Sequence, residues 1–583
     1  MTRTNTRNFT GFLGLVSAVT LATATGCSTP PPPSEDAGTD SSVMGMDGTV
    51  ENDGSTAPDA TVETDGSTET DGGTGPEAGT DGGTPSGDWG FRPMPHGFSF
   101  ENYTNMSMPM NLTSQEMRRL FGPTVCEGAA AAGACTLVPQ AKTWMDRQNA
   151  GMNGGHCEGL AVLSSLMYTG ASSPMMFGAA TDAFSLMAMG NDALTRELAL
   201  WFVTQGTIPG LERRDQTPNQ IVERLTTELS RGRAFGGTVV GIYLRAGGGG
   251  HAITPMYIRR PSEGVAEIVV YDNNFPNTER VVTVNTVMNT WSYTASTNPM
   301  EPGALYDGDA TTFNLTLADI APRTMFPHAC SFCGNVAMDG GGRASVQIAL
   351  NGEGDLSISD GMGGTTGSNA AGAPVNSIPG ANVARIRSGL FSDSPEPIYT
   401  VPRATPLTIT LDGSRLSAAT DSEILISGPG FSLGVDGISL DPMQRDTVIV
   451  QPGQPDITYR ASGAETPTLS LALQTAADDF DIEVRSGAMA AGQNLRLAAD
   501  LPMSRARISF AGSTSAPTFE LYMERVTETG SAVFRHVGVT ATATTVLYVN
   551  YATWAGNGMP LSVGVDLDGN GTIDRTDMLA DQP

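Results

Sequence analysis

The stretch from about residue 340 to 564 constrains the fold most, because it repeats one pattern many times. Short runs rich in β-branched residues alternate there with Gly, Pro, Asp and Ser, which favour turns. Examples are Ser345–Leu350, Leu407–Leu411, Thr447–Val450, Thr468–Leu473 and Thr544–Asn550. Many short strands separated by turn signals are typical of a β-sandwich. We therefore expect an all-β, sandwich-like region here, built as one module or as two.

Residues 89–335 show a different pattern, with helical signals first and strand signals later. Helical spacing covers residues 114–121, 139–149, 193–204 and 218–231. Thr113 opens a capping box, and Thr217 is followed by Pro in the first helical turn. Runs rich in Val, Ile and Tyr, which predict strands, cover Thr238–Leu244, Ala252–Ile258, Ala266–Tyr271 and Arg280–Asn285. Helices followed by an antiparallel sheet predict an α+β domain.

The chain carries a strong negative charge, which excludes one class of partner. Lys and Arg number 32 against 61 Asp and Glu, so the formal net charge is −29 at pH 7. Fourteen of the acids lie in residues 28–88, which hold no Lys or Arg. Because such a chain is repelled by a phosphate backbone, we expect no nucleic acid partner.

Residues 1–27 predict a lipoprotein signal peptide. Arg3 and Arg7 precede an apolar stretch that is too short and too rich in Ser and Thr for a membrane span. It ends in Ala24-Thr25-Gly26-Cys27, which resembles the bacterial lipobox. The resemblance implies a diacylglycerol on the Cys27 sulfur, cleavage before Cys27 and acylation of the new amino group, which together hold a protein on a lipid bilayer. A plain secretory signal cleaved near Ala24 is the alternative.

Residues 28–88 predict a disordered acidic tether. They consist mainly of Pro, Ser, Thr, Gly and Asp, with near-repeats such as Thr70–Thr74 and Thr80–Thr84. Such a segment buries too little apolar surface to offset the entropy that ordering would cost. A lipid, a tether and folded domains in this order predict an anchored protein of the bacterial cell envelope, outside the cytoplasm, at the outer membrane or the cell surface.

The six cysteines single out one thiol. They are Cys27, Cys126, Cys135, Cys157, Cys330 and Cys333. In an oxidising compartment we expect Cys126 and Cys135 to close a small loop, and Cys330 and Cys333 to form a local disulfide. A redox pair or half a zinc site is the alternative for the last two. With Cys27 assigned to lipid, Cys157 remains as a free thiol.

Cys157 lies in a setting that favours nucleophilic chemistry. It follows two glycines and His156 and precedes an apolar helical run, so its thiol is expected at a helix N-terminus, where the dipole favours the thiolate. His251 follows four glycines and begins a predicted strand. Asp272 is the first polar residue after the next strand. In chain order these three supply a nucleophile, a base and an acid that orients the base.

These residues resemble the papain-like cysteine peptidase superfamily, and in it the bacterial branch that includes the leader-cleaving peptidases of bacteriocin exporters. The match covers roughly residues 140–295, well within one domain of ordinary size. The resemblance implies a papain-like domain in which Cys157 attacks a carbonyl of a peptide or protein substrate. It also implies that His251 transfers the proton and that Asp272 holds the imidazole.

The family usually binds the oxyanion with a Gln that precedes the Cys by several residues. Gln148 and Asn153 are the candidates here, and neither has the customary spacing. The backbone amide of Cys157 is a second donor in such sites.

Several alternatives stay open at this point. Asn273 could replace Asp272 as the orienting group, and His156 could act as a rival base or as a metal ligand beside Cys157. Cys157 could also be a small buried apolar residue, and His251 a surface residue with satisfied hydrogen bonds. Transglutaminase-like proteins share the same residue order and would run acyl transfer, and an amidase would use the same groups. A non-catalytic adhesion or binding lipoprotein with a degenerate papain-like domain belongs to another functional class.

The C-terminal residues 565–583 contain a calcium-loop pattern. The candidate ligands are Asp566, Asp568, Asn570, Thr572, Asp574 and Asp577. Their spacing follows the EF-hand rule, and Gly571 allows the sharp bend that this loop requires. The segment resembles the EF-hand and dockerin loops, which implies a structural Ca²⁺. It departs from them in having Asp577 instead of Glu and a predicted strand, residues 561–565, before the loop. A solvated acidic terminus is the alternative.

Overall fold

The computed structural model describes residues 85–582 except 105–110, 129–134, 179, 212–214, 244–249, 296–302, 335–344, 388–396 and 513–516. The predicted signal peptide, Cys27 and nearly all of the predicted tether lie outside the described residues. All described residues belong to one unit of the chain. Within these ranges, no helix has both the length and the apolar character needed to cross a membrane.

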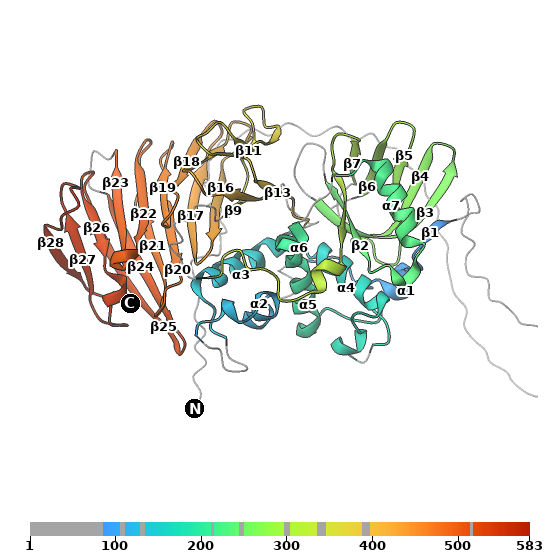
Figure 1. The fold of residues 1–583 in the computed structure, drawn as a ribbon, viewed down its shortest axis with the longest axis horizontal. Helices are drawn as coiled ribbons and strands as arrows, with labels where there is room; N and C mark the ends of the chain where they lie inside the picture. Colours follow the sequence, from blue (N-terminus) through green and yellow to red (C-terminus); the bar gives the residue numbers. More distant parts are fainter. Residues whose placement is uncertain are drawn as a thin grey trace, which may run out of the picture. The chain divides into compact units, whose positions relative to one another are not determined.

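Helices dominate the first part of this unit (Figure 1). They are α1 (Pro93–His96), α2 (Ser114–Phe121), α3 (Pro139–Gly151), α4 (Cys157–Thr169), α5 (Asp192–Val203), α6 (Ile208–Leu211) and α7 (Pro218–Leu229). The side chains of Thr113 and Thr217 cap α2 and α7, and Glu116 and Gln220 complete the two capping boxes. The predicted starts of both helices are therefore confirmed.

An eight-stranded antiparallel sheet follows and curls into a half-barrel (Figure 1). Its strands are β1 (Ser86–Asp88), β2 (Thr238–Tyr243), β3 (Gly250–Ser262), β4 (Val265–Tyr271), β5 (Glu279–Asn285), β6 (Thr290–Ala295), β7 (Ala304–Asp309) and β8 (Leu315–Asp319). The order is β7-β6-β5-β4-β3-β2-β8, with β1 beside β3. Helices α4 and α7 pack against β3. The α+β character expected for this region is confirmed.

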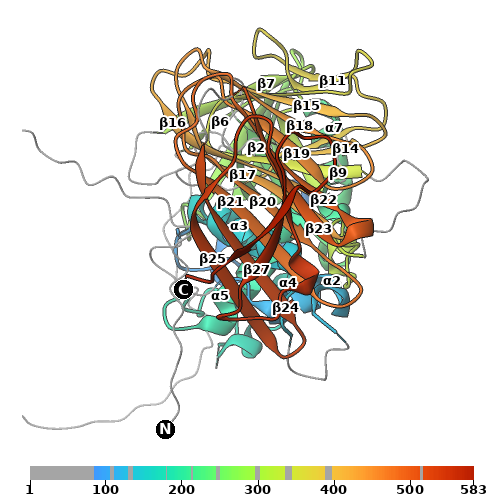
Figure 2. The ribbon, with the colours of Figure 1, turned by 90° about the vertical axis from the view of Figure 1, so that its left-hand side faces the viewer.

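The rest of the chain forms two large antiparallel sheets, whose C-terminal strands, in red, face the viewer in Figure 2. In order across the first, they are β12 (Pro374–Asn376), β11 (Thr365–Ser368), β10 (Asp355–Ser359), β15 (Leu407–Asp412), β18 (Arg445–Val450), β19 (Asp456–Arg460), β22 (Asn494–Asp500), β23 (Arg505–Ala511), β26 (Val546–Val549), β27 (Leu561–Asp566) and β28 (Arg575–Leu579). Across the second they are β13 (Asn382–Ala384), β14 (Ile398–Pro402), β9 (Ser345–Asn351), β16 (Thr420–Gly428), β17 (Phe431–Leu440), β20 (Thr468–Leu473), β21 (Asp479–Ser486), β24 (Thr518–Thr527) and β25 (Gly530–Thr540).

Side-chain alternation explains how these two sheets share a core. In β15, Leu407, Ile409 and Leu411 are buried, whereas the residues between them are only partly buried. Buried residues of both sheets, from Val346 to Val565, form one hydrophobic cluster. Two sheets that bury one face each against a common core make a sandwich. The all-β region expected from the sequence is confirmed.

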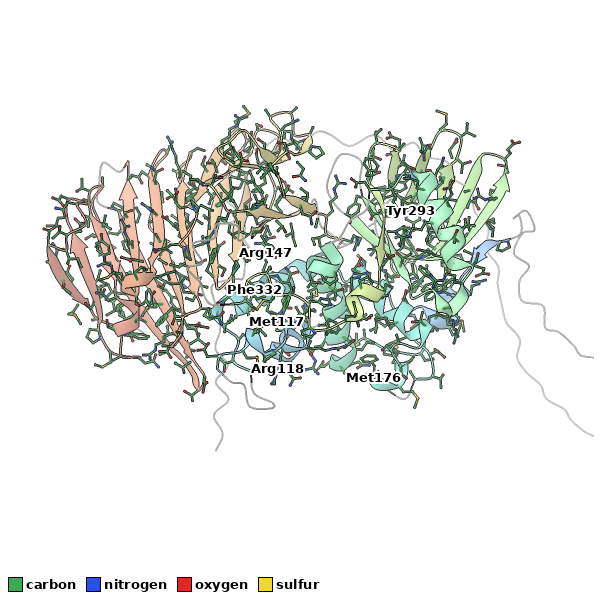
Figure 3. All side chains as sticks on the ribbon, viewed as in Figure 1. Met117, Arg118, Arg147, Met176, Tyr293 and Phe332 are labelled. Atoms are coloured by element: carbon green, nitrogen blue, oxygen red, sulfur yellow. A yellow bond between two sulfur atoms is a disulfide. The ribbon has the colours of Figure 1, made fainter. Side chains whose placement is uncertain are left out.

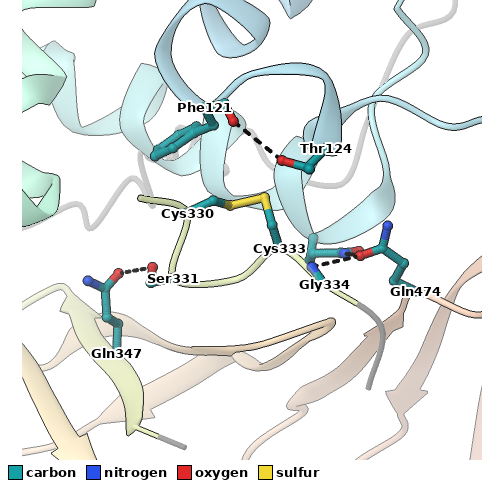
Figure 4. The surroundings of a disulfide bond; sticks show 9 residues. Phe121, Thr124, Cys330, Ser331, Cys333, Gly334, Gln347 and Gln474 are labelled. Atoms are coloured by element: carbon teal, nitrogen blue, oxygen red, sulfur yellow. Dashed lines mark hydrogen bonds between the residues drawn. A yellow bond between two sulfur atoms is a disulfide. The ribbon is translucent and has the colours of Figure 1, made fainter. Parts of the chain in front are cut away.

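The two predicted local disulfides are confirmed as Cys126–Cys135 and Cys330–Cys333. The second lies where the helices meet the sandwich (Figure 4). Close to it, the backbone N–H of Gly334 donates a hydrogen bond to the Gln474 side chain at 3.2 Å. The disulfide thus lies in the segment that connects the helical region to the sandwich, next to a hydrogen bond between the two.

Aromatic packing supports the same junction. Phe332, between the two bridged cysteines, is fully buried and contacts Phe121 and Trp144. On α3, Arg147 lies 3.9 Å from Glu423 of β16, so the sandwich and the helices also contact each other through charged groups (Figure 3).

Candidate active site

Cys157 is the first residue of α4, as the sequence predicts. Gly155 precedes it with a φ of 119°, a value that favours glycine, and this lets the chain turn into the helix. The N-cap residue, His156, makes no side-chain cap. The first amides of α4, including that of Cys157, therefore have no partner within the helix. Cys157 is buried and is the free cysteine among those described.

Strands β3 and β4 bring the predicted base and acid together. His251 is the second residue of β3, and Asp272 follows the last residue of β4. Because Thr254 pairs with Tyr271, the two side chains lie at the same end of the strand pair. His251 Nε2 is 2.7 Å from Asp272 Oδ1, and both residues are buried. The structure places Asp272, and not Asn273, on the imidazole.

The environment of Asp272 keeps its carboxylate ionised. Its Oδ2 accepts a hydrogen bond from the hydroxyl of Tyr293 on β6, and its Oδ1 accepts one from the backbone N–H of Asn274 at 2.9 Å. Burial by itself would raise the pKa of Asp272, but the His251 imidazole and these donors lower it. Tyr293 is labelled among the strands of the half-barrel in Figure 3.

Asp272 in turn determines the charge of His251. Burial would lower the pKa of the imidazole, but the carboxylate and an interaction with the Cys157 thiol raise it to about 10. The ring is therefore an imidazolium at neutral pH, the form that accompanies a thiolate in nucleophilic catalysis. Nδ1 is buried and has no directional hydrogen-bond partner among the described residues. Since Asp272 occupies Nε2, Nδ1 is the nitrogen left for proton transfer.

Asn273 ties the helix of the nucleophile to the strand of the base. Its Nδ2 donates hydrogen bonds to the carbonyl of Cys157 at 3.1 Å and to that of Ala252 at 2.9 Å. The backbone carbonyl of Asn273 accepts a hydrogen bond from the backbone N–H of Asn102 at 2.9 Å. The first residue of α4 and the beginning of β3 are thus fixed to one buried side chain.

His156 has a structural environment that removes it as the rival base. Its Nδ1 is 2.9 Å from the Tyr103 carbonyl and its Nε2 is 2.9 Å from Asn111 Oδ1, so both nitrogens are engaged. Burial lowers the pKa of His156 to about 4, so the ring is neutral at physiological pH and donates only one of these two hydrogen bonds. Its stacking on the Tyr103 ring, at 4.3 Å between centroids, completes a packed position.

The two oxyanion candidates are both less buried than the Cys157 thiol. Gln148 is half-buried on α3, and Asn153 is exposed on the short 3-10 helix η2 (Met152–Gly154). Neither side chain has a hydrogen bond to Cys157 among the described residues. The backbone amide of Cys157, which has no acceptor within α4, remains the candidate donor for an oxyanion.

Glu158, next to the nucleophile, forms a buried ionic cluster that sequence reasoning missed. Its Oε1 lies 2.5 Å from Arg323 Nη1 and 3.0 Å from Arg387 Nη2, and its Oε2 lies 2.6 Å from Arg387 Nε. All three side chains are buried. Burial would raise the pKa of Glu158, but the two guanidinium groups lower it. No local signal reveals the cluster, because the partners are 165 and 229 residues away in sequence.

Three of the predicted calcium ligands lie together at the C-terminal end of the sandwich. Asp566, Asp568 and Asp574 each offer a ligand atom, and these atoms lie within 4.8 Å of one another. The group could hold a metal ion. The backbone N–H groups of Gly569 and Gly571 each donate to Asp566 at 2.8 Å, and Gly571 has a φ of 89°. The predicted bend at this glycine is therefore present.

The other three predicted ligands make contacts within the loop or beside it. Asn570 Oδ1 accepts a hydrogen bond from the backbone N–H of Thr572 at 2.8 Å. Asp577 lies on β28, where its Oδ1 is 3.0 Å from Arg575 Nε. The strand predicted before the loop is β27, and a second strand follows the loop.

Comparisons with other proteins add no constraint to this picture. No protein family model, no curated protein and no solved structure matches the chain. The functional conclusion therefore rests on the geometry of the chain's own residues.

Proposed function

We propose that this chain is a cysteine hydrolase of the papain-like type, acting on peptides or proteins, with Cys157, His251 and Asp272 as its catalytic residues. One observation carries the proposal. The imidazole of His251 is held through Nε2 by a buried carboxylate and interacts with the Cys157 thiol that begins α4, while its Nδ1 is not used by any other residue of the described chain. This is the arrangement that a nucleophile, a proton carrier and an orienting acid require.

Cys157 and His251 would have different roles in the two steps of the hydrolysis. The Cys157 thiolate attacks the substrate carbonyl, and the amide of Cys157 stabilises the negative charge on its oxygen. His251 Nδ1–H protonates the leaving nitrogen as the carbon–nitrogen bond breaks, which leaves a thioester and a neutral imidazole. That imidazole takes a proton from water, whose oxygen attacks the thioester, and the thiolate leaves again. An amine in place of this water would give acyl transfer.

Covalent labelling of Cys157 tests this proposal. A peptidyl epoxide probe is expected to modify Cys157 in the native protein at neutral pH, as located by mass spectrometry of digested peptides. Cys157→Ser should lose the label. His251→Ala should slow labelling by about 100-fold, within the range that a general acid–base group contributes.

The bridged cysteines, Cys126–Cys135 and Cys330–Cys333, serve as internal controls and should stay unmodified. Labelling that occurs only after unfolding would contradict the proposal. It would favour a binding lipoprotein in which Cys157 is part of the core.

We also propose that the protein is anchored to a membrane of the bacterial cell envelope through acylated Cys27. The lipobox-like residues 24–27 and the acidic segment 28–88 support this. Cys27→Ser is expected to move the protein from the detergent phase to the aqueous phase in a detergent partition assay, because the acyl chains supply the membrane affinity. Continued partition of this variant into detergent would rule out lipid attachment at Cys27.

We further propose that the three-aspartate group of Asp566, Asp568 and Asp574 binds Ca²⁺. Carboxylate oxygens suit this hard cation, and an ion that binds only the folded state stabilises it. At 100 times the dissociation constant, calcium should add about 2.7 kcal/mol to the free energy of unfolding. Thermal melting with calcium and with chelator measures this shift.

Two matched substitutions identify the calcium ligands. Asp568→Asn should remove most of the calcium-dependent shift, because it deletes one charged oxygen from the group. Asp577→Asn, on β28, should keep the shift if Arg575 holds that carboxylate. If neither calcium nor chelator changes the melting temperature of the unaltered protein, the proposed calcium site is refuted.

A further inference from the structure

The β-sandwich contributes a side chain to the surroundings of the nucleophile. Arg387 follows β13, the edge strand of the nine-stranded sheet, and its guanidinium binds both carboxylate oxygens of Glu158. We infer that the sandwich completes the active site, with Arg387 as a positioning residue that holds the first turn of α4 through Glu158. This inference rests on the proposed function, because it concerns the same nucleophile.

The attachment of Arg387 involves its main chain as well as its side chain. Gln205, on the 3-10 helix η4 (Thr204–Gly206), accepts the Arg387 N–H at 2.6 Å and donates to the Arg387 carbonyl at 3.0 Å. The hydroxyl of Tyr243 on β2 donates to the carbonyl of Arg385 at 3.3 Å. A short piece of the sandwich is therefore bound to the half-barrel and the helices by paired polar contacts.

The half-barrel also accommodates this piece sterically. A Cβ atom at Gly241 of β2 would lie 2.8 Å from Cδ of Arg387, closer than side-chain carbons approach one another. Glycine at this position leaves the space through which the arginine reaches Glu158. The contact between Arg387 and Glu158 thus depends both on the glycine at position 241 of β2 and on the arginine of the sandwich.

The third member of the cluster makes the role of Arg387 testable. Arg323, on the 3-10 helix η6 (Ala321–Thr324), also contacts Glu158. Two guanidinium groups and one carboxylate leave one buried net positive charge next to the first turn of α4. Such charge, close to the helix N-terminus, stabilises negative charge that develops on a substrate oxygen.

Geometry gives the second reason for an effect on catalysis. Glu158 follows Cys157 directly in the chain. A shift of the Glu158 side chain would therefore move the backbone amide and the thiol of Cys157 together. A displacement of about 1 Å in an active site costs on the order of 100-fold in rate. Loss of the bidentate contact would therefore reduce reactivity even where folding is preserved.

Arg387→Met is the decisive variant. It leaves Glu158 paired with Arg323, so the buried cluster loses its net positive charge and becomes neutral, and the Met side chain fills part of the vacated volume. With the peptidyl epoxide probe on the full chain, the maximal labelling rate of Cys157 should fall by about 10- to 100-fold. The half-saturating probe concentration should change by less than about threefold, because Arg387 does not touch the probe.

Two further variants make the result specific. Arg387→Lys restores the charge without the two-pronged geometry and should recover only part of the rate. Arg415→Ala removes an exposed arginine that pairs with Asp355 in the sandwich, and should label as fast as the unaltered protein. A fall in the maximal labelling rate at an unchanged melting temperature is a result that a purely structural role would not produce.

The outcomes separate this inference from the proposed function. Equal maximal rates for the unaltered protein and Arg387→Met would overturn the inference and leave the cysteine hydrolase proposal in place. If Arg387→Met fails to fold, equal rates for Arg387→Lys and the unaltered protein would overturn it instead. Absence of labelling in the unaltered protein would contradict the proposed function itself.

Discussion

Replacing Glu158 with Gln is expected to reduce the free energy of unfolding by about 3–5 kcal/mol, the range found when one partner of a buried ion pair is removed. The substitution keeps the size of the side chain but leaves Arg323 and Arg387 as two buried cations without a counter-charge. Chemical denaturation at neutral pH measures the loss. The same substitution at half-buried Glu267, paired with Arg259, should cost no more than about 1 kcal/mol.

The pH dependence of this loss gives an independent check. The pKa of Glu158 is lowered in the folded state, so its charge stabilises the fold at any pH above the unfolded-state pKa, which has the ordinary value of 4.5. That contribution disappears as the pH falls through the lowered folded-state pKa. The difference between the unaltered protein and Glu158→Gln should therefore be largest near neutrality and shrink in acid. A loss below 1 kcal/mol at neutral pH would show that the cluster is not desolvated.

Local sequence signals predict those parts of the molecule whose causes are local. The capping box at Thr113 sets the start of α2, and the glycines before Cys157 set the start of α4. Period-2 alternation predicts strands such as β15. Cys157, His251 and Asp272 could be proposed together because each lies at the end of an element that its own neighbours define. The neighbouring residues in the sequence were enough to propose these three side chains.

Contacts that depend on the tertiary arrangement could not be predicted in this way. Tyr293 reaches Asp272 from β6, which lies two strands from β4 in the sheet, and Arg387 reaches Glu158 from a different sheet. The calcium-loop spacing is satisfied at Asp577, yet the chain enters β28 there and the carboxylate meets Arg575. A spacing rule records which residues are present, whereas the direction of each side chain depends on the strand that follows.

Asp272→Asn is expected to lower the turnover of a fluorogenic peptide pool by on the order of 10³- to 10⁴-fold, the largest effect on activity that we predict. The amide keeps the shape of the side chain but removes the charge that holds His251 as an imidazolium. Because burial lowers the pKa of His251 and the Asp272 carboxylate is the largest influence that raises it, that pKa should fall from about 10 in the variant. Titration of the His251 ring by NMR measures this change directly.

Two companion variants make the Asp272 result interpretable. Tyr293→Phe removes one donor from the carboxylate but keeps its charge, so it should lower turnover much less than Asp272→Asn does. Asp500→Asn deletes a carboxylate of the sandwich that pairs with Arg505 and should leave turnover unchanged. If Asp272→Asn lowers the pKa of His251 while turnover persists at its original rate, the imidazolium is not the proton donor. The role of His251 in the proposed reaction would then have to be given up.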